Sequence, residues 1–97
     1  MVENRNLIYI YRKYFRLIYV YQDGSETHSR ESLPAIFKTL NNKTFVKTGR
    51  YIINIECIRR VRKKEITLNN GILLKLSKKI FDIVRWAIHR YNFDQPH

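Results

Sequence analysis

Cysteine, glycine and proline are all scarce in this sequence. Its 97 residues include one cysteine, three glycines and two prolines. The single cysteine, Cys57, excludes an internal disulfide and a zinc site built from cysteines. Because its neighbours Ile55, Ile58 and Val61 are apolar, we expect a buried, unreactive thiol. The three glycines lie in apparent turns, so the chain has no glycine-rich loop of the kind that cradles a phosphate.

Long apolar runs are also missing. No stretch approaches the roughly 20 apolar residues that cross a bilayer. The segment LIYIY, residues 7–11, is soon interrupted by Arg12 and Lys13, so it does not resemble the core of a signal peptide. We therefore expect a soluble, cytoplasmic protein without a membrane span.

Acidic residues are few, and this shortage has the largest functional consequence. Nineteen Lys and Arg face eight Asp and Glu, which gives a formal net charge of +11 at pH 7. Such an excess predicts a polyanionic partner, either a nucleic acid or an anionic membrane surface. The 44% hydrophobic and 13% aromatic content favours a folded domain over a disordered basic tail.

No catalytic or metal-binding pattern is visible. The three histidines, His28, His89 and His97, show no metal-ligand spacing with one another or with Cys, Asp or Glu. The acids are scattered, and no two of them are placed by the sequence for acid–base catalysis. We interpret the chain as a non-enzyme with no cofactor and no metal.

The sequence does contain a succession of short strand-like segments. β-Branched and aromatic residues predict strands at residues 7–11, 15–21, 26–30, 44–48, 51–55, 57–63, 65–68 and 72–76. Asp23-Gly24 supplies the positive φ angles of a tight hairpin turn. Asn70-Gly71 suits a hairpin turn of type I′.

Two helices complete the predicted fold. Apolar residues recur at helical spacing in residues 32–41 and 78–91, with Ser32 and Ser77 as caps. The tail, residues 92–97, should fray. The whole chain, residues 1–97, is therefore interpreted as one mostly-β domain with its core at about 7–90.

The positive charge is concentrated after residue 42. Eight cations occur against one acid, Glu56: Lys43, Lys47, Arg50, Arg59, Arg60, Arg62, Lys63 and Lys64. A run of charge is often only a solvated face, but this excess favours phosphate binding. Interleaved tyrosines such as Tyr14 and Tyr51 could stack on bases, although aromatic residues at strand spacing more often belong to a core.

Several segments occur in an order that resembles a known family. They are SLPAIFKTL, FVKTGRYIIN, IECIRRV, ITLNNG and LKLSKK. Over about residues 7–90 they resemble the LytTR DNA-binding domain of bacterial response regulators. That family has a short helix opening with Ser-Leu, a Phe-x-Arg-x-His-Arg-Ser-Tyr-x-Val-Asn signature, and a hairpin ending in Asn-Gly. The resemblance implies short antiparallel sheets with one short internal helix and a C-terminal helix.

The resemblance also implies which residues bind DNA. In the family, three connections rather than a recognition helix enter successive major grooves of duplex DNA. Carried over by position, the DNA-binding residues are Arg12, Lys13 and Tyr14 in the first connection, Lys47, Thr48, Gly49 and Arg50 in the second, and Lys78 and Lys79 in the third. Lys47 fits a phosphate contact, and Arg50 fits the position after the signature histidine.

Some positions depart from the family pattern. Gly49 stands where the family has histidine, which removes a side-chain contact but permits close approach of the backbone. The spacing from Phe45 to Asn54 is one residue shorter than in the family. Lys78 and Lys79 replace arginine, which weakens bidentate reading of guanine while keeping phosphate attraction.

The densest run of cations, residues 59–64, falls in the hairpin region of the family rather than in a base-reading connection. We expect it to supply long-range attraction and distant phosphate contacts, while the two quieter segments at 47–50 and 77–79 read the sequence.

The resemblance implies a bacterial transcriptional regulator, the output domain of a two-component system. Because the domain begins almost at Met1, we expect no receiver domain before it; the protein would then be free-standing, controlled by a separate regulatory protein, or cut from a longer chain. Self-association on repeated half-sites is a further expectation. The alternatives are an RNA-binding module, such as a small ribosome-associated protein, and an adaptor at an anionic membrane surface.

Overall fold

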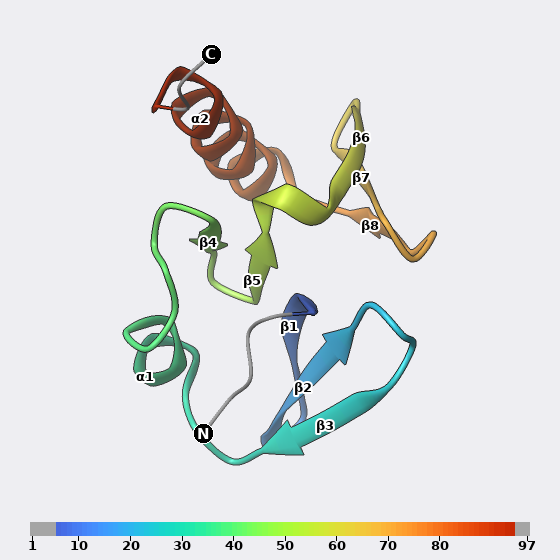
Figure 1. Cartoon of the computed structure of the whole chain (residues 1–97), viewed down its shortest axis with the longest axis vertical. Coiled ribbons are helices and arrows are strands. Elements are labelled where there is room, and N and C mark those ends of the chain that lie inside the picture. Colours follow the sequence, from blue (N-terminus) through green and yellow to red (C-terminus); the bar gives the residue numbers. More distant parts are fainter. Residues whose placement is uncertain (1–5, 95–97) are drawn as a thin grey trace.

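The computed structural model describes the backbone of residues 6–94 and the side chains of residues 6–92. Within these residues the elements are β1 (Leu7–Lys13), β2 (Arg16–Tyr21), β3 (Glu26–Ser29), α1 (Leu33–Phe37), β4 (Phe45–Lys47), β5 (Tyr51–Asn54), the 3₁₀ turn η1 (Ile55–Cys57), β6 (Ile58–Arg62), β7 (Glu65–Leu68), β8 (Leu73–Lys75) and α2 (Lys78–Asp94) (Figure 1). One antiparallel sheet has five strands in the order β3-β2-β1-β5-β4, and a second has three in the order β6-β7-β8. The predicted mostly-β class with a short internal helix and a C-terminal helix is confirmed.

Both faces of the five-stranded sheet are buried, which explains why its strands are apolar at successive positions. Ile52 and Ile53 are neighbours in β5, and both are 0% exposed because they face opposite sides. Ile52 belongs to a cluster that includes Leu33 and Ile36 of α1. Ile53 belongs to a second cluster, with β7, β8 and α2. In Figure 1, α1 lies at the lower left, and α2 and the three-stranded sheet lie above.

A β-bulge in β1 decides which side chains reach each cluster. The pairing of β1 with β2 shifts register between Leu7 and Tyr9, so Ile8 is an extra residue. Ile8 and Tyr9 therefore both belong to the cluster with α2, whereas Leu7 and Ile10 belong to the cluster with α1. The bulge allows four consecutive buried residues to fill two separate cores.

The tight turns are not where the glycine pairs predicted them. At Asn70-Gly71 only the glycine has positive φ, so the type I′ prediction is wrong. The connection is a three-residue loop, in which the Leu68 N–H donates to the Ile72 carbonyl at 2.9 Å. The loop at Asp23-Gly24 likewise has positive φ at the glycine alone. Positive φ at both central residues occurs instead at Lys63-Lys64 (29° and 67°), although each such residue costs about 1 kcal/mol.

The first predicted helix is capped as expected but is shorter. The Ser32 hydroxyl accepts the Ala35 N–H at 3.2 Å, which confirms the cap. After Phe37, the Thr39 N–H donates to the Ile36 carbonyl, three residues back, at 2.9 Å. The Thr39 hydroxyl donates to the same carbonyl at 2.7 Å. These bonds tighten the backbone and end the α-helix at Phe37.

The predicted strand at residues 57–63 begins one residue late, because η1 occupies Ile55–Cys57. The last predicted strand is shorter than 72–76, since β8 covers only Leu73–Lys75. The C-terminal helix continues beyond residue 91 to Asp94, so the tail does not fray from residue 92. The rest of the predicted tail, residues 95–97, lies outside the described residues.

Candidate nucleic-acid interface

Two of the predicted DNA-binding connections meet at one end of the five-stranded sheet. The pairing of β1 with β5 ends at Tyr11–Tyr51, so Arg12, which follows Tyr11, and Arg50, which precedes Tyr51, lie at the same end of the sheet. Both arginines are exposed. The first and second connections are far apart in the sequence, yet the β1–β5 ladder makes them neighbours.

The tip of the β1–β2 hairpin exposes two aromatic side chains. Because Lys13 pairs with Arg16, the loop is Tyr14-Phe15 rather than the predicted 12–14, and Arg12 is a strand residue. Tyr14 is 85% exposed and Phe15 is 93% exposed. The φ of Tyr14 is 57°, an uncommon conformation for an aromatic residue. The sequence analysis missed Phe15 because its aromatic ring looked like the start of a strand.

Two cations at the same end of the sheet were also missed. The pairing of β2 with β3 ends at Leu17–Ser29, so Arg16, which precedes Leu17, and Arg30, which follows Ser29, lie at this end of the sheet. Both arginines are exposed. The loop at Asp23-Gly24 is the signal that could have found them. A three-residue loop there sets the observed register of β2 with β3, whereas a two-residue turn would set a different one.

Thr48 stiffens the β4–β5 loop rather than presenting itself to a partner. Its Oγ1 accepts the N–H of Tyr51 at 2.9 Å and that of Arg50 at 3.3 Å. Its own N–H donates to the Tyr51 carbonyl at 2.8 Å. Thr48 is 3% exposed, whereas Gly49 and Arg50 are exposed. The threonine therefore positions the two residues that follow it.

Glycine is not required sterically at position 49. Gly49 does not have positive φ, and no atom lies within 4 Å of the place where its Cβ would be. The local backbone would therefore accept a residue with a Cβ at this position. The absence of a side chain here leaves the loop backbone open to a partner.

The start of α2 provides the third predicted connection. The Ser77 hydroxyl accepts the Ile80 N–H at 3.3 Å, so the serine caps the helix as predicted. Lys78 and Lys79 are both exposed. The Lys78 Nζ lies 3.1 Å from a carboxylate oxygen of Asp82. Among the described residues no ion pair involves Lys79, so of the two lysines it is the more available to an anion.

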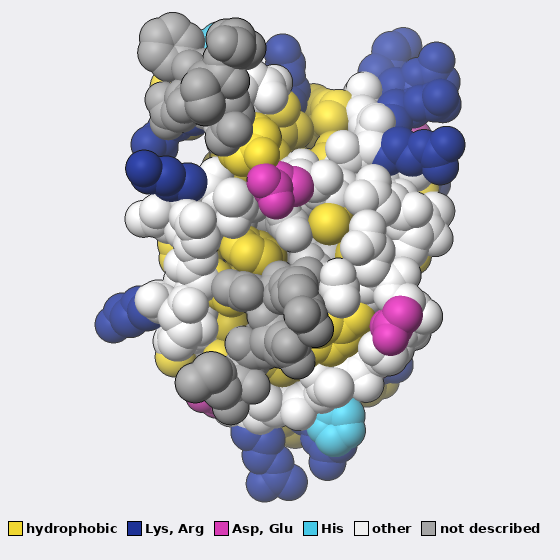
Figure 2. All heavy atoms as spheres, in the orientation of Figure 1, with side chains coloured by type: hydrophobic (Ala, Val, Ile, Leu, Met, Phe, Trp, Pro, Cys, Tyr) yellow, Lys and Arg dark blue, Asp and Glu magenta, His cyan; other side chains and the backbone are white. Residues whose placement is uncertain are grey.

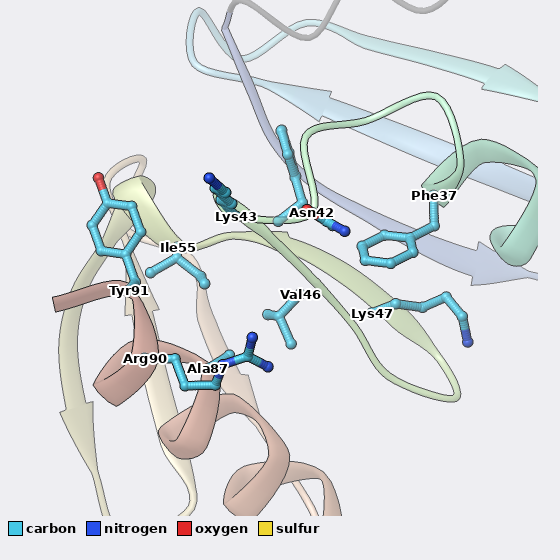
Figure 3. A pocket seen from close by; sticks show the side chains of 10 residues that line it. Phe37, Asn42, Lys43, Val46, Lys47, Ile55, Ala87, Arg90 and Tyr91 are labelled. Atoms are coloured by element: carbon cyan, nitrogen blue, oxygen red, sulfur yellow. The ribbon is translucent and has the colours of Figure 1, made fainter. Parts of the chain in front are cut away.

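A positively charged groove runs between β4 and the last turns of α2 (Figure 3). Its volume is about 1080 Å³. Phe37 and Lys43 lie on one side and Arg90 and Tyr91 on the other, with Lys47 at the end of β4. None of the described lining residues is acidic. The groove therefore extends the cationic surface from Lys47 toward the C-terminal helix.

Most tyrosines belong to the fold. Tyr9 and Tyr19 are buried, at 6% and 2% exposure, and burial raises the pKa of Tyr9 to about 12. The rings of Tyr9 and Tyr11 stack with their centroids 5.5 Å apart. Tyr51 tilts against Tyr9 at 6.5 Å. A core or cross-strand role is confirmed for these residues. Tyr14, at the hairpin tip, is the tyrosine whose ring is exposed and therefore available for stacking.

The described residues contain no candidate metal-binding cluster. Among them, no three His, Cys, Asp or Glu lie where they could hold a metal ion. Cys57 is 7% exposed as predicted, and burial raises the pKa of its thiol. His89 stacks on Trp86, and His97 lies outside the described residues. Within the same part of the chain, no helix has the length and apolar character needed to cross a membrane.

Cations are spread over several parts of the visible surface. In the view of Figure 2, Lys and Arg side chains lie at the upper right, over the β6–β7 hairpin, at the lower end, beneath β1–β3, and along the left and upper edges.

A β-rich domain that exposes two aromatic rings among arginines, with a net charge of +11, is typical of nucleic-acid-binding modules. The chain belongs to the LytTr DNA-binding domain family, whose model matches residues 1–88. The family predicted from the sequence segments is thereby confirmed, and with it the class of DNA-binding output domains of response regulators.

One solved structure shows the same fold. It is the LytTr DNA-binding domain of a Bacillus cereus protein described as a methyl-accepting/DNA response regulator, with a TM-score of 0.79 and 15% sequence identity. The alignment covers 90% of this chain and 84% of that chain. At this identity the similarity concerns the fold. A search of curated proteins found no match.

Proposed function

We propose that this protein binds duplex DNA with sequence preference and regulates transcription. The β1–β2 tip, the β4–β5 loop and the start of α2 enter grooves along one side of the duplex. The protein acts as a non-enzymatic regulator in the bacterial cytoplasm, and copies bind neighbouring half-sites. A separate regulatory protein is its controlling partner.

The pairing of β1 with β5 is the observation that carries this proposal. Its last pair, Tyr11–Tyr51, brings Arg12 and Arg50 to the end of the sheet that carries the exposed Tyr14-Phe15 tip. Arg16 and Arg30 lie at the same end of the sheet, beside the Leu17–Ser29 pair. Like charges gathered in one place repel one another, and a bound anion would offset that repulsion. A phosphate backbone lying across this end of the sheet would supply that anion.

The chemistry of each side chain suggests its role. Arg50, at the exposed end of a stiff loop, has the planar fork that donates two hydrogen bonds to a guanine edge. Phe15 has no hydrogen-bonding atom, so its groove contact is apolar and favours the methyl group of thymine. Lys47 is half-buried at the edge of the groove in Figure 3, which suits a phosphate contact.

The test begins with selection of preferred duplexes from a random library, followed by affinity measurements on preferred and random duplexes at one salt concentration. Arg50→Ala should weaken binding to the preferred duplex by roughly 5- to 150-fold and binding to random duplex much less. Phe15→Ala should reduce preference at a thymine position. Lys38→Ala is the matched control, because it removes an exposed cation at the end of α1, outside the proposed interface.

The salt dependence of the wild-type protein gives a second measurement. If four to six phosphates are neutralised, log K against log salt should have a slope of roughly −4 to −5. A flat response would remove the electrostatic basis of the proposal. Single-stranded RNA that outcompetes duplex DNA would favour the RNA-binding alternative instead.

A further inference from the structure

The turn between β6 and β7 is formed by residues that its backbone geometry disfavours. Arg62 pairs with Glu65, so the loop is the two residues Lys63 and Lys64. Their φ angles of 29° and 67° are both positive, as a type I′ turn requires. Asn-Gly is the pair that fits such a turn without strain, and the chain uses Asn-Gly at its other hairpin of this sheet.

Lysine at both positions destabilises the fold, since side chains with a Cβ are disfavoured at positive φ. Strained backbone of this kind persists where the residues serve a purpose other than stability. Lysine adds one thing that Asn-Gly does not: positive charge at the end of an exposed hairpin. Positive charge is therefore the property that the two lysines contribute in spite of the strain.

The tip lies beside the start of α2. The Leu76 N–H donates to the Lys64 carbonyl at 2.8 Å, one residue before the helix cap Ser77. Glu65 pairs with Lys75 on the adjacent strand. The run of cations at residues 59–64 is thus not distant from the third DNA-binding connection, because its last residue is hydrogen-bonded to the segment that leads into it.

These contacts combine lysines from two segments into one surface, at the upper right of Figure 2 where dark blue side chains gather over the β6–β7 hairpin. The exposed lysines are Lys63, Lys64, Lys75, Lys78 and Lys79. The acids nearest to them by pairing are Glu65, in β7, and Asp82, which is engaged by Lys78. Five lysines against two acids leave the surface strongly positive, so it favours an anion.

We propose that Lys63 and Lys64 form a phosphate-binding tip that grips the DNA backbone beside the groove entered by the start of α2. This inference rests on the proposed DNA binding and adds to it a contact that supplies affinity without sequence preference. Lysine is a flexible point charge and lacks the planar fork that reads guanine, so the tip binds phosphate rather than base edges. Both lysines neutralise phosphate charge at the cost of a strained turn.

The decisive variant is the double substitution K63N/K64G, which installs the preferred type I′ pair and removes both charges. It should raise the melting temperature by roughly 10 °C, because the strain at both positions is relieved. It should also weaken binding to preferred and random duplexes alike, by roughly 10-fold at 0.15 M salt, and make the salt slope shallower by about 2. A protein that becomes more stable and binds less tightly cannot have lost affinity through misfolding.

The conservative variant K63R/K64R keeps both charges and should bind random duplex within about 2-fold of wild type. If K63N/K64G binds both duplexes like wild type with an unchanged salt slope, the tip has no role, while the proposed function stands. Loss confined to the preferred duplex would assign base reading to the tip and overturn phosphate binding. If wild-type protein shows no salt-dependent binding to any duplex, both proposals fail.

Discussion

Replacing Asn54 with alanine should destabilise the fold by about 3 kcal/mol without changing the DNA affinity of the folded protein. Asn54 ends β5 and is 9% exposed. Its Nδ2 donates to the Leu7 carbonyl at 2.9 Å, and its Oδ1 accepts the Glu56 N–H at 3.0 Å. One side chain thus ties β5 to β1 and starts the 3₁₀ turn that leads into the second sheet.

The magnitude follows from these two bonds. Each contributes about 1 kcal/mol net, and a buried carbonyl left short of a partner adds roughly 1–3 kcal/mol. Leu7 is 0% exposed, so water cannot replace the lost amide. Thermal unfolding measures the change, since 1 kcal/mol lowers the midpoint by about 4–8 °C in a domain of this size. DNA affinity is then measured well below the midpoint of the variant.

Asn54→Asp is the informative companion, because it keeps the acceptor and loses the donor. Its carboxylate would face the Leu7 carbonyl, which raises its folded pKa above the unfolded value. Stability of the variant is then greatest below the unfolded pKa and is lost as pH rises through the folded pKa. At pH 7 the Asp variant should have a lower free energy of unfolding than the Ala variant. This difference should shrink as the pH falls toward 4. A loss below 1 kcal/mol in the Ala variant, or weaker DNA binding by fully folded protein, would refute the structural role.

Two further predictions concern pH and charge. Burial raises the pKa of Tyr9 from 10.0 to about 12, so stability should fall between pH 10 and 12 as the unfolded chain ionises first. Over that pH range the Tyr9→Phe variant should lose about 2 kcal/mol less of its free energy of unfolding than the wild-type protein does, as measured by urea unfolding. The same pH dependence in both proteins would contradict the raised pKa of Tyr9. Asp82→Asn removes a negative charge beside the third connection and releases Lys78 from its ion pair. Duplex affinity should rise roughly 2- to 5-fold with a steeper salt slope, and weaker binding would place the start of α2 away from DNA.

Local patterns in the sequence were enough to predict most elements and both helix caps. Ser32 and Ser77 hydrogen-bond to N–H groups three residues later, which is a contact that short spacing alone determines. Burial of Cys57 likewise follows from its apolar neighbours. The turns were predicted less well, because Asn-Gly marks a preference and the pairing of the strands decides the loop length. The Lys63-Lys64 hairpin supports the same conclusion, since a pair with no turn preference forms a two-residue turn.

The sequence by itself therefore determined the mostly-β class, the excess of positive charge and the segments that resemble LytTR domains. Only the tertiary structure decided which charges act together. The β1–β5 ladder brings Arg12 and Arg50 to one end of the sheet, and a hydrogen bond from the Leu76 N–H to the Lys64 carbonyl joins the lysine tip to the segment before α2. A one-residue change in loop length shifts such a register and turns every side chain of a strand to the other face. Periodicity within one segment carries no information about that register, so the placement of Phe15, Arg16 and Arg30 at the interface required the folded chain.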